Sequence, residues 1–491
     1  MDSGVVLAVS FIVYSAGIVG FGLYSTKLRK KTTDDFVLAN RELGPWASSL
    51  SASASAESGW VMLGLVGEAY LFGAAAFWIV PGIACGYVFN WYVIAERLRK
   101  ATAGSGAVTL PQYIMHRFGP GSASLRFISV AIITLAMLGY VAAQMNAAGK
   151  AFDAVFSLPY WLGVLAGAFI ILTYTVTGGF RAICWTDIIQ ASFMFVALIV
   201  MPFVVLDKLG GYSSFLSQAT AVDPNMLTFT YGNVGFALFG FVIGLLGIGL
   251  GYPGQPHILS RFMATKDSDS IKKGGSIALT WMVLVYLGAV FFGLFAKVYF
   301  GVLDDPEQAL PLAVGEFLPP VLGGFVIAAI VSAICSTADS QLIVVSTTIS
   351  RDVIPFFRKK PTQAGADEFA RTQRVDRWVL VILAVISIFF ALTENRVIFE
   401  FVLYAWSGLG AAFGPVVVLG LLWKRTNKAG ALAGMLTGGI VTIVWRNTEC
   451  LKAIVYELVP AFILAFAAVV IVTLVTSPDK PERSPGEQNA Q

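Results

Sequence analysis

The sequence predicts an all-α membrane protein with thirteen transmembrane helices. Of its 491 residues, 57% are hydrophobic and 13% are charged, whereas a water-soluble domain is about half apolar and one quarter charged. The apolar runs are long enough to cross a bilayer, at about 20 residues each. They are continuous, as in residues 193–205 and 379–392, whereas strands of a membrane barrel alternate apolar and polar residues. Since backbone groups in hydrocarbon must be paired within the protein, continuous runs indicate helices.

Hydropathy divides the chain into thirteen spans. They cover residues 5–25, 46–70, 74–97, 124–150, 159–178, 186–206, 233–257, 275–300, 320–348, 377–394, 397–422, 428–446 and 454–476. We expect residues 1–476 to form a single membrane domain. The polar segment 477–491 is predicted to be a disordered cytoplasmic tail.

Basic residues fall on alternate sides of the predicted membrane. They follow spans one, three, five, seven, nine and eleven, for example at Lys27, Arg97, Arg181, Arg261 and Arg351. Because cytoplasmic loops are rich in Lys and Arg, this pattern predicts an external N-terminus and a cytoplasmic C-terminus. The net charge of +4 therefore reflects membrane orientation and does not indicate nucleic acid as a partner.

Two spans are predicted to be interrupted. Span two contains a serine-rich run, residues 48–60, with Gly59 at mid-depth, and span seven contains four glycines followed by Tyr252-Pro253-Gly254-Gln255-Pro256. Glycine and proline at this density weaken a helix and remove a backbone donor. Such breaks expose carbonyl oxygens, which suit a cation, and helix N-termini, which suit a carboxylate.

The interrupted spans occupy corresponding places in the chain. Span two opens a block of five spans, residues 46–206, and span seven opens a second block, residues 233–422. Because each block has an odd number of spans, the two insert with opposite topology, which predicts an inverted-repeat transporter. Residues 428–476 are left as two extra helices. For either break alone, close helix packing by small residues is the alternative interpretation.

Polar residues inside the spans are the candidate site. The hydroxyls of Ser336 and Thr337, with carbonyls of span two, are suited to form an oxygen cage for a small cation, although such hydroxyls also bond their own helix. Glu57 is an ionisable residue within a span and therefore a functional candidate, as part of a cation site or as a proton acceptor. Asp187 is either a partner of a helix dipole or a cation relay on the cytoplasmic side.

Three aromatic residues, Trp60, Tyr140 and Tyr252, lie at plausible pocket depth, although aromatic residues in membrane helices also serve as core or interface belt. The sequence contains no nucleophile, metal or phosphate-binding motif that would indicate an enzyme. A membrane sensor or a channel is a further alternative. A sensor would carry an attached signalling domain, and a channel would lack a closed pocket at mid-membrane.

Several separate stretches resemble the sodium:solute symporter family, and within it the bacterial sodium/proline symporter branch. The resemblance extends over nearly the whole chain. Its most specific parts are Ser58-Gly59-Trp60, Gly178-Gly179-Phe180, Trp185-Thr186-Asp187, Gly251-Tyr252, Gly254-Gln255-Pro256-His257-Ile258-Leu259, Ser336-Thr337, Tyr404-Ala405-Trp406 and residues 410–417.

The resemblance implies the leucine-transporter (LeuT) fold, a 5+5 inverted repeat, with one extra N-terminal and two extra C-terminal helices. It implies one sodium ion, held by the carbonyls of Ala54, Glu57 and Ala333 and the hydroxyls of Ser336 and Thr337. It also implies solute contacts from Trp60, Tyr140, Tyr252 and Pro256, and a place for Asp187 on the sodium exit path.

The function implied is sodium-coupled symport, with Na⁺ as the coupling ion. The chain would import a small amino-acid-like solute by alternating access, with L-proline as the leading candidate. We expect it in the bacterial cytoplasmic (inner) membrane, surrounded by lipid and without an obligatory protein partner.

Two positions depart from the proline pattern. Ala56-Glu57 stands where these symporters carry an aspartate-methionine pair, and Ile248 stands where a tryptophan is expected near the solute. The departures leave two alternatives open, another small organic solute and proton coupling through Glu57.

Overall fold

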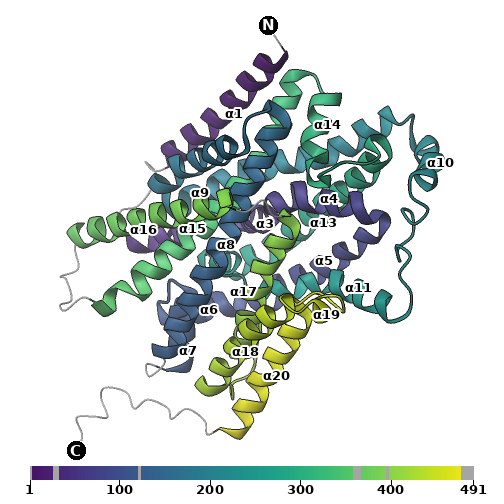
Figure 1. Ribbon diagram of the computed structural model, residues 1–491. Helices are drawn as coiled ribbons and strands as arrows, with labels where there is room; N and C mark the ends of the chain where they lie inside the picture. Colours follow the sequence, from purple (N-terminus) through teal and green to yellow (C-terminus); the bar gives the residue numbers. More distant parts are fainter. Residues whose placement is uncertain (1–2, 26–31, 120–122, 358–365, 394–396, 477–491) are drawn as a thin grey trace, which may run out of the picture.

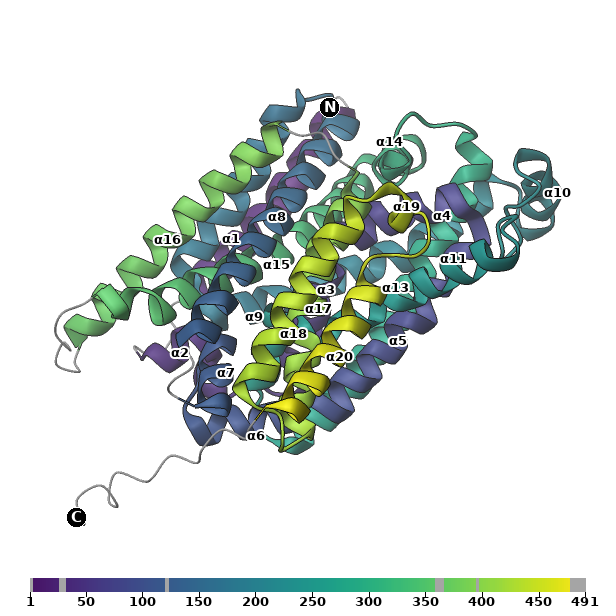
Figure 2. The same ribbon diagram turned by 60° about the horizontal axis from the view of Figure 1, so that its bottom comes forward.

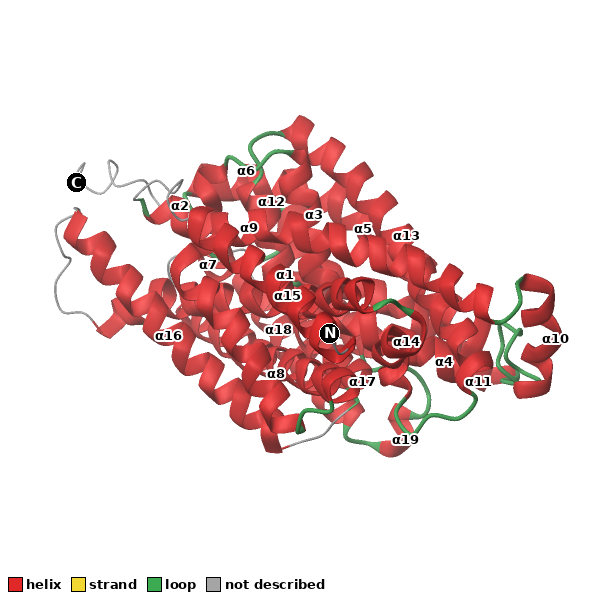
Figure 3. Cartoon of the chain, turned by 90° about the horizontal axis from the view of Figure 1, so that it is seen from above, coloured by secondary structure: helices red, strands yellow, loops and turns green. Residues whose placement is uncertain are grey.

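The computed structural model describes residues 3–25, 32–119, 123–357, 366–393 and 397–476. Across these residues the chain is a bundle of helices joined by loops (Figure 1, Figure 3). One isolated parallel bridge, between Leu43 and Thr265, is the only strand-like pairing in these ranges. The predicted all-α class is confirmed, while the predicted tail, residues 477–491, lies outside the described residues.

The helices follow one another along the whole chain. In order they are α1 (Ser3–Ser25), α2 (Thr33–Leu38), η2 (Ala39–Arg41), α3 (Pro45–Gly59), η3 (Trp60–Leu65), α4 (Val66–Phe72), η4 (Gly73–Trp78), α5 (Ile79–Phe89), η5 (Asn90–Ile94), α6 (Ala95–Ser105), α7 (Leu110–Phe118), α8 (Ala123–Phe156), α9 (Tyr160–Lys208), α10 (Tyr212–Val222), α11 (Gly235–Gly247), η6 (Ile248–Gly254), α12 (Pro256–Ala264), α13 (Ser268–Phe300), η7 (Pro306–Gln308), α14 (Ala309–Phe317), α15 (Pro320–Asp352), η8 (Ile354–Phe357), α16 (Ala366–Thr393), α17 (Ile398–Leu422), α18 (Lys428–Arg446), α19 (Glu449–Lys452) and α20 (Leu458–Val475).

Eleven helical stretches within the described residues are long and apolar enough to cross a membrane. The protein is therefore a multi-pass membrane protein. One of these stretches, Pro45–Ser105, covers the two predicted spans 46–70 and 74–97. Likewise α9 covers the predicted spans 159–178 and 186–206. The division into thirteen spans stays a prediction.

The centre of the bundle is built around α3. It packs against α9, α12, α13 and α15 (Figure 1). Every residue of α3 from Ala47 to Gly59 is buried. Since these residues are mostly Ser, Ala and Gly, neighbouring backbones can approach α3 closely. The serine-rich segment is thus the interior of the protein and does not face lipid.

A kink divides α9 at Gly179. This glycine has φ +66°, and a Cβ there would lie 2.7 Å from the Phe36 ring. Only glycine takes up this conformation at little cost. The kink turns the helix next to Phe180 and Arg181, between the predicted spans 159–178 and 186–206. The long helices of the bundle run side by side (Figure 2). The start of α1 and the end of α20 lie at opposite ends of this bundle.

Candidate functional site

The first interrupted helix breaks at Ser58. This residue has φ 24° and ψ −172°, a conformation that costs a non-glycine residue on the order of 1–3 kcal/mol. Neighbouring backbone groups find specific partners. The Gly59 N–H donates to Gln144 Oε1 at 3.0 Å, and the Trp60 N–H donates to Ser58 Oγ at 3.2 Å. The predicted interruption of span two is confirmed.

The second interrupted helix opens over η6. The α-helix α11 ends at Gly247, and α12 begins at Pro256, after Gln255 with φ −92° and ψ 105°. Trp406 of α17 forms two hydrogen bonds with this segment. The Trp406 Nε1 donates to the Ile248 carbonyl at 3.0 Å, and Gln255 Nε2 donates to the Trp406 carbonyl at 3.0 Å. The interruption of span seven is confirmed, and an aromatic side chain from α17 bonds to the backbone of Ile248.

The hydroxyls of α15 meet the backbone of α3. Ser336 Oγ donates to the Ala54 carbonyl at 3.0 Å and to the Ala333 carbonyl at 3.1 Å. Thr337 Oγ1 donates to the Ser55 carbonyl at 3.0 Å. All these residues are fully buried or nearly so. The structure therefore brings together four of the five residues predicted to hold a cation.

The carbonyl of Glu57, the fifth predicted ligand, accepts a hydrogen bond from the Trp60 amide. Its side chain is completely buried and extends to α5, where the Tyr87 hydroxyl donates to Oε1. Its Oε2 atom has no hydrogen-bond partner among the described residues. A buried carboxylate without a cation is costly, so Glu57 is an open acceptor in the middle of the protein.

The predicted solute residues lie in two groups. Trp60 packs against Tyr286 at 5.8 Å and Phe399 at 5.9 Å between ring centroids, and Tyr252 packs against Tyr87 and Trp406, both at 4.8 Å. Glu57 links these rings, because its carboxylate bonds to Tyr87 and its backbone to Trp60.

The other two predicted solute residues meet at the start of α12, where Pro256 is the first residue and Tyr140 approaches from α8. The Tyr140 ring faces the His257 ring edge-on, with centroids 6.1 Å apart, and Pro256 directly precedes His257 in the chain. The Tyr140 hydroxyl and both His257 ring nitrogens are buried and have no partner in the described part of the chain. These polar atoms are open to a ligand.

Asp187 lies in a buried network with Arg261. Arg261 Nη2 is 3.2 Å from Asp187 Oδ2, and neither side chain is exposed. Ser51 Oγ donates to the same carboxylate oxygen at 2.6 Å, and Arg261 Nη2 donates to Ser340 Oγ at 2.5 Å. Ser340 in turn bonds to Ser55 at 2.9 Å. The network thus runs from Asp187 to the candidate cation site.

Arg261 corrects the sequence analysis. It was placed in a basic loop after span seven, but α12 continues to Ala264 and Arg261 is one of the largest completely buried side chains. Its guanidinium carbon lies 4.9 Å from the centre of the Phe180 ring. The sequence signal that was missed is the helical spacing of His257 and Arg261, which lets Arg261 Nη1 donate to the His257 carbonyl at 2.8 Å.

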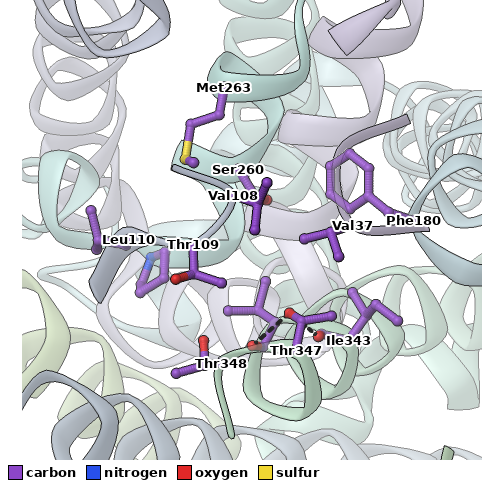
Figure 4. Close-up of a pocket in the computed structure, with 12 residues that line it drawn as sticks. Val37, Val108, Thr109, Leu110, Phe180, Ser260, Met263, Ile343, Thr347 and Thr348 are labelled. Carbon is purple, nitrogen blue, oxygen red and sulfur yellow. Dashed lines mark hydrogen bonds between the residues drawn. The ribbon is translucent and has the colours of Figure 1, made fainter. Parts of the chain in front are cut away.

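Cavities reach the site from both faces of the bundle and differ in size. On the face of α19, a cavity of about 400 Å³ extends from Arg446 and Lys452 to Ile248 and Phe399. On the face of α7, the cavity holds only about 20 Å³; Pro256 and Ser260 line it with Thr109, Thr347 and other residues (Figure 4). The path to the site is thus wide on one face and closed on the other.

Comparison with known proteins shows which family the chain belongs to. A sequence model described as "SSF: Sodium:solute symporter family" matches residues 36–438. The chain belongs to the sodium:solute symporter family. Its transporter class follows from this membership, and an enzyme is not indicated.

Curated members of the sodium:solute symporter family resemble the chain throughout. The osmoregulated proline transporter OpuE of Bacillus subtilis is 36% identical over 479 residues, covering 96% of this chain and 95% of that protein. The sodium/proline symporter of Escherichia coli is 37% identical over 481 residues, covering 96% and 93%. The resemblance stated from motifs is confirmed.

Two solved structures of membrane transporters have a similar overall fold. A Na⁺-coupled sialic acid symporter in a substrate-bound, outward-open state has a TM-score of 0.81 and 19% identity, covering 98% of this chain and 100% of that chain. Mhp1 in an inward-facing conformation has a TM-score of 0.53 and 14% identity, covering 88% and 91%.

Proposed function

We propose that this chain is a sodium-coupled secondary symporter that imports a small amino-acid-like solute, with L-proline as the first candidate. Membership of the sodium:solute symporter family supports the reaction type, and the names of the relatives support the solute. The observation that carries the proposal is the meeting of the Ser336 and Thr337 hydroxyls with the carbonyls of the interrupted α3.

The proposed Na⁺ site consists of oxygen atoms only. Backbone carbonyls of an interrupted helix together with side-chain hydroxyls are ligands that transporters use for Na⁺. The ligands proposed are the carbonyls of Ala54, Glu57 and Ala333 and the hydroxyls of Ser336 and Thr337. With the ion bound, the two hydroxyl hydrogens turn away from the carbonyls, so that all five oxygens face the cation.

The proposed solute site lies beside it, between the interrupted helices. Trp60, Tyr140, Tyr252 and Pro256 are its proposed contacts. Pro256 is the first residue of α12, and a helix N-terminus favours a carboxylate because its N–H groups and dipole are positive there. An amino-acid carboxylate is therefore expected at this end of the site.

Alternating access is the proposed transport cycle. The wide cavity at Ile248 and the narrow one at Pro256 are consistent with an outward-facing state. The Asp187–Arg261 network then closes the cytoplasmic side, and Asp187 lies on the proposed exit path for Na⁺. One elementary charge crossing 100 mV releases about 2.3 kcal/mol, enough for roughly 50-fold accumulation.

The membrane arrangement belongs to the same proposal. We infer thirteen spans, with an inverted repeat of residues 46–206 and 233–422, extra helices at the N-terminus and over residues 428–476, and a cytoplasmic C-terminus. The start of α1 and the end of α20 at opposite ends of the bundle support an odd number of crossings (Figure 2). The expected location is the bacterial cytoplasmic membrane.

The test is uptake of radiolabelled L-proline into proteoliposomes at fixed pH. We expect uptake to require an inward Na⁺ gradient and to stop when choline replaces Na⁺. Unchanged uptake in choline would exclude sodium coupling. No uptake of proline in either buffer would exclude proline, and a competition screen of other small solutes would then identify the solute.

Proton coupling through Glu57 is the second candidate, because this buried carboxylate has an open oxygen. Proton coupling predicts that an inward proton gradient drives solute uptake in sodium-free buffer. It also predicts that Glu57→Gln abolishes this proton-driven uptake.

A further inference from the structure

The carboxylate of Glu57 has no role in the proposed sodium site or in the proposed alternating-access cycle. Its backbone carbonyl is one of the proposed sodium ligands, but its carboxylate extends to the other side of α3, toward Tyr87 of α5. The side chain is 0% exposed, and Oε2 has no hydrogen-bond partner within the described residues. No ion pair to Lys, Arg or His involves Glu57 in this part of the chain. A carboxylate in such surroundings requires a cation or a proton.

Packed aromatic side chains lie next to this carboxylate. Tyr87, which bonds to Glu57, packs edge-on against Tyr252, and Tyr252 packs edge-on against Trp406, both with centroids 4.8 Å apart. Trp60, three residues after Glu57, packs edge-on against Tyr286 at 5.8 Å. The five rings come from five elements, and none is more than 3% exposed. We call them the aromatic box: Trp60, Tyr87, Tyr252, Tyr286 and Trp406.

A carboxylate beside aromatic faces has a specific chemical preference. Aromatic faces attract cations and are the usual recognition surface for alkylated ammonium groups. A primary ammonium is compact and strongly hydrated, so it gives up more hydration than an alkylated one on entering a dry, ring-lined space.

We propose that the Glu57 carboxylate and the aromatic box bind the positively charged nitrogen of the solute, and that this selects zwitterions whose nitrogen is alkylated. The inference rests on the proposed function, because it assigns the nitrogen of the same solute whose carboxylate is proposed to lie at α12. Glu57 then serves two ligands: its carbonyl faces Na⁺ and its carboxylate faces the solute. Movement of this one residue links the two binding events.

The test compares solutes that carry a charged nitrogen with one that does not. Thermal unfolding of the purified full chain in saturating Na⁺ is measured with L-proline, N-methyl-L-proline, glycine betaine and tetrahydrofuran-2-carboxylate. The last probe has an oxygen in place of the proline nitrogen. Because a ligand that binds the folded state raises the unfolding temperature, we expect the three nitrogen probes to raise it and the oxygen analogue not to.

Variants locate the effect at Glu57. Glu57→Gln should raise the concentration of proline needed for half of the thermal shift by at least tenfold. The control Glu96→Gln removes a partly exposed carboxylate that pairs with Lys100 at 2.6 Å, and it should leave the shift unchanged. If Glu57→Gln does not fold, Glu57→Asp serves instead, and it should weaken all nitrogen probes together because its carboxylate is one methylene shorter.

The outcomes separate the two proposals. An equal shift with the oxygen analogue and with proline, an unchanged response in Glu57→Gln, or no shift with any nitrogen probe would overturn the role of Glu57. The first two of these results leave sodium/proline symport standing. A shift with glycine betaine but not with proline would support the role of Glu57 and remove proline from the proposed function.

Discussion

Arg261 and Asp187 form an ion pair inside the protein, with Arg261 Nη2 3.2 Å from Asp187 Oδ2 and neither side chain exposed. The two residues are 74 positions apart in the sequence and come from α12 and α9. Ser51 and Ser340 complete the network from α3 and α15. Four helices are therefore joined at one buried point between the candidate cation site and the closed face of the bundle.

Removing one member of this pair should be costly. Arg261→Gln leaves Asp187 as a buried charge without its counter-ion, which destabilises a protein by about 3–5 kcal/mol. We expect a clear fall in the thermal unfolding temperature in detergent. The double variant Arg261→Gln with Asp187→Asn should regain part of the loss, because no unpaired charge remains. The control is Arg97→Gln, at an exposed arginine; an equal effect of the two single variants would contradict the prediction.

The proposed sodium site predicts two variants with the same effect. Ser336→Ala and Thr337→Ala each remove one oxygen ligand, and each should raise the Na⁺ concentration for half-maximal uptake roughly tenfold, which corresponds to about 1.4 kcal/mol. Initial uptake rates measured over a range of Na⁺ concentrations give this value. Ser346→Ala is the matched control, because the Ser346 hydroxyl bonds only to the Ile343 carbonyl of its own helix, at 3.1 Å. The site is misplaced if neither variant differs from this control.

Gly249 should not tolerate a side chain. It lies in the interrupted segment η6, and a Cβ there would overlap the carbonyl oxygen of Gly82. The atoms that a Cβ would meet belong to the backbone of α5, and backbone atoms cannot rotate away as a side chain can. Gly249→Ala must therefore displace η6 from α5, at a cost of about 1–3 kcal/mol as for other overpacked sites. Gly439→Ala is the control, since no atom lies within 4 Å of its Cβ position in α18. We expect a lower unfolding temperature for the first variant only.

Glu307 should stabilise the start of α17. Its two carboxylate oxygens accept from the backbone N–H groups of Ile398 and Phe399 at 3.0 and 2.8 Å, and Lys150 Nζ lies 2.7 Å from one of them. Glu307→Ala removes all three contacts and leaves Lys150 with Asp305 alone. We expect a loss of roughly 3 kcal/mol, measured by thermal unfolding, because the lysine is buried. The exposed Glu316 provides the control, and an equal effect of Glu316→Ala would argue against this account.

The interrupted helices could be predicted because their cause is local. Glycine, proline and serine weaken a helix wherever they occur, so the breaks at Ser58 and η6 followed from residue types alone. The partners of the open backbone could not be predicted in this way. Gln144 bonds to Gly59, and Trp406 bonds to Ile248, over separations of 85 and 158 residues.

Arg261 was misjudged for the same reason. On a hydropathy profile a basic residue at the end of a span marks a loop, and the local sequence does not show that Asp187 is the partner of Arg261. The end of α12 at Ala264 and the kink of α9 beside Gly179 place Arg261 next to Asp187 and Phe180. Only the packing of these two helices distinguishes a buried ion pair from a solvated loop.

The sequence by itself determined that the chain lies in a membrane, that it is helical and where its helices break, since transfer to lipid and helix propensity depend on nearby residues. The tertiary structure alone decided which buried polar groups are paired and which are open. Asp187 has Arg261, whereas no basic side chain pairs with Glu57 among the described residues. The reason is physical: the cost of a buried charge is set by the groups that surround it, and here those groups come from distant parts of the chain.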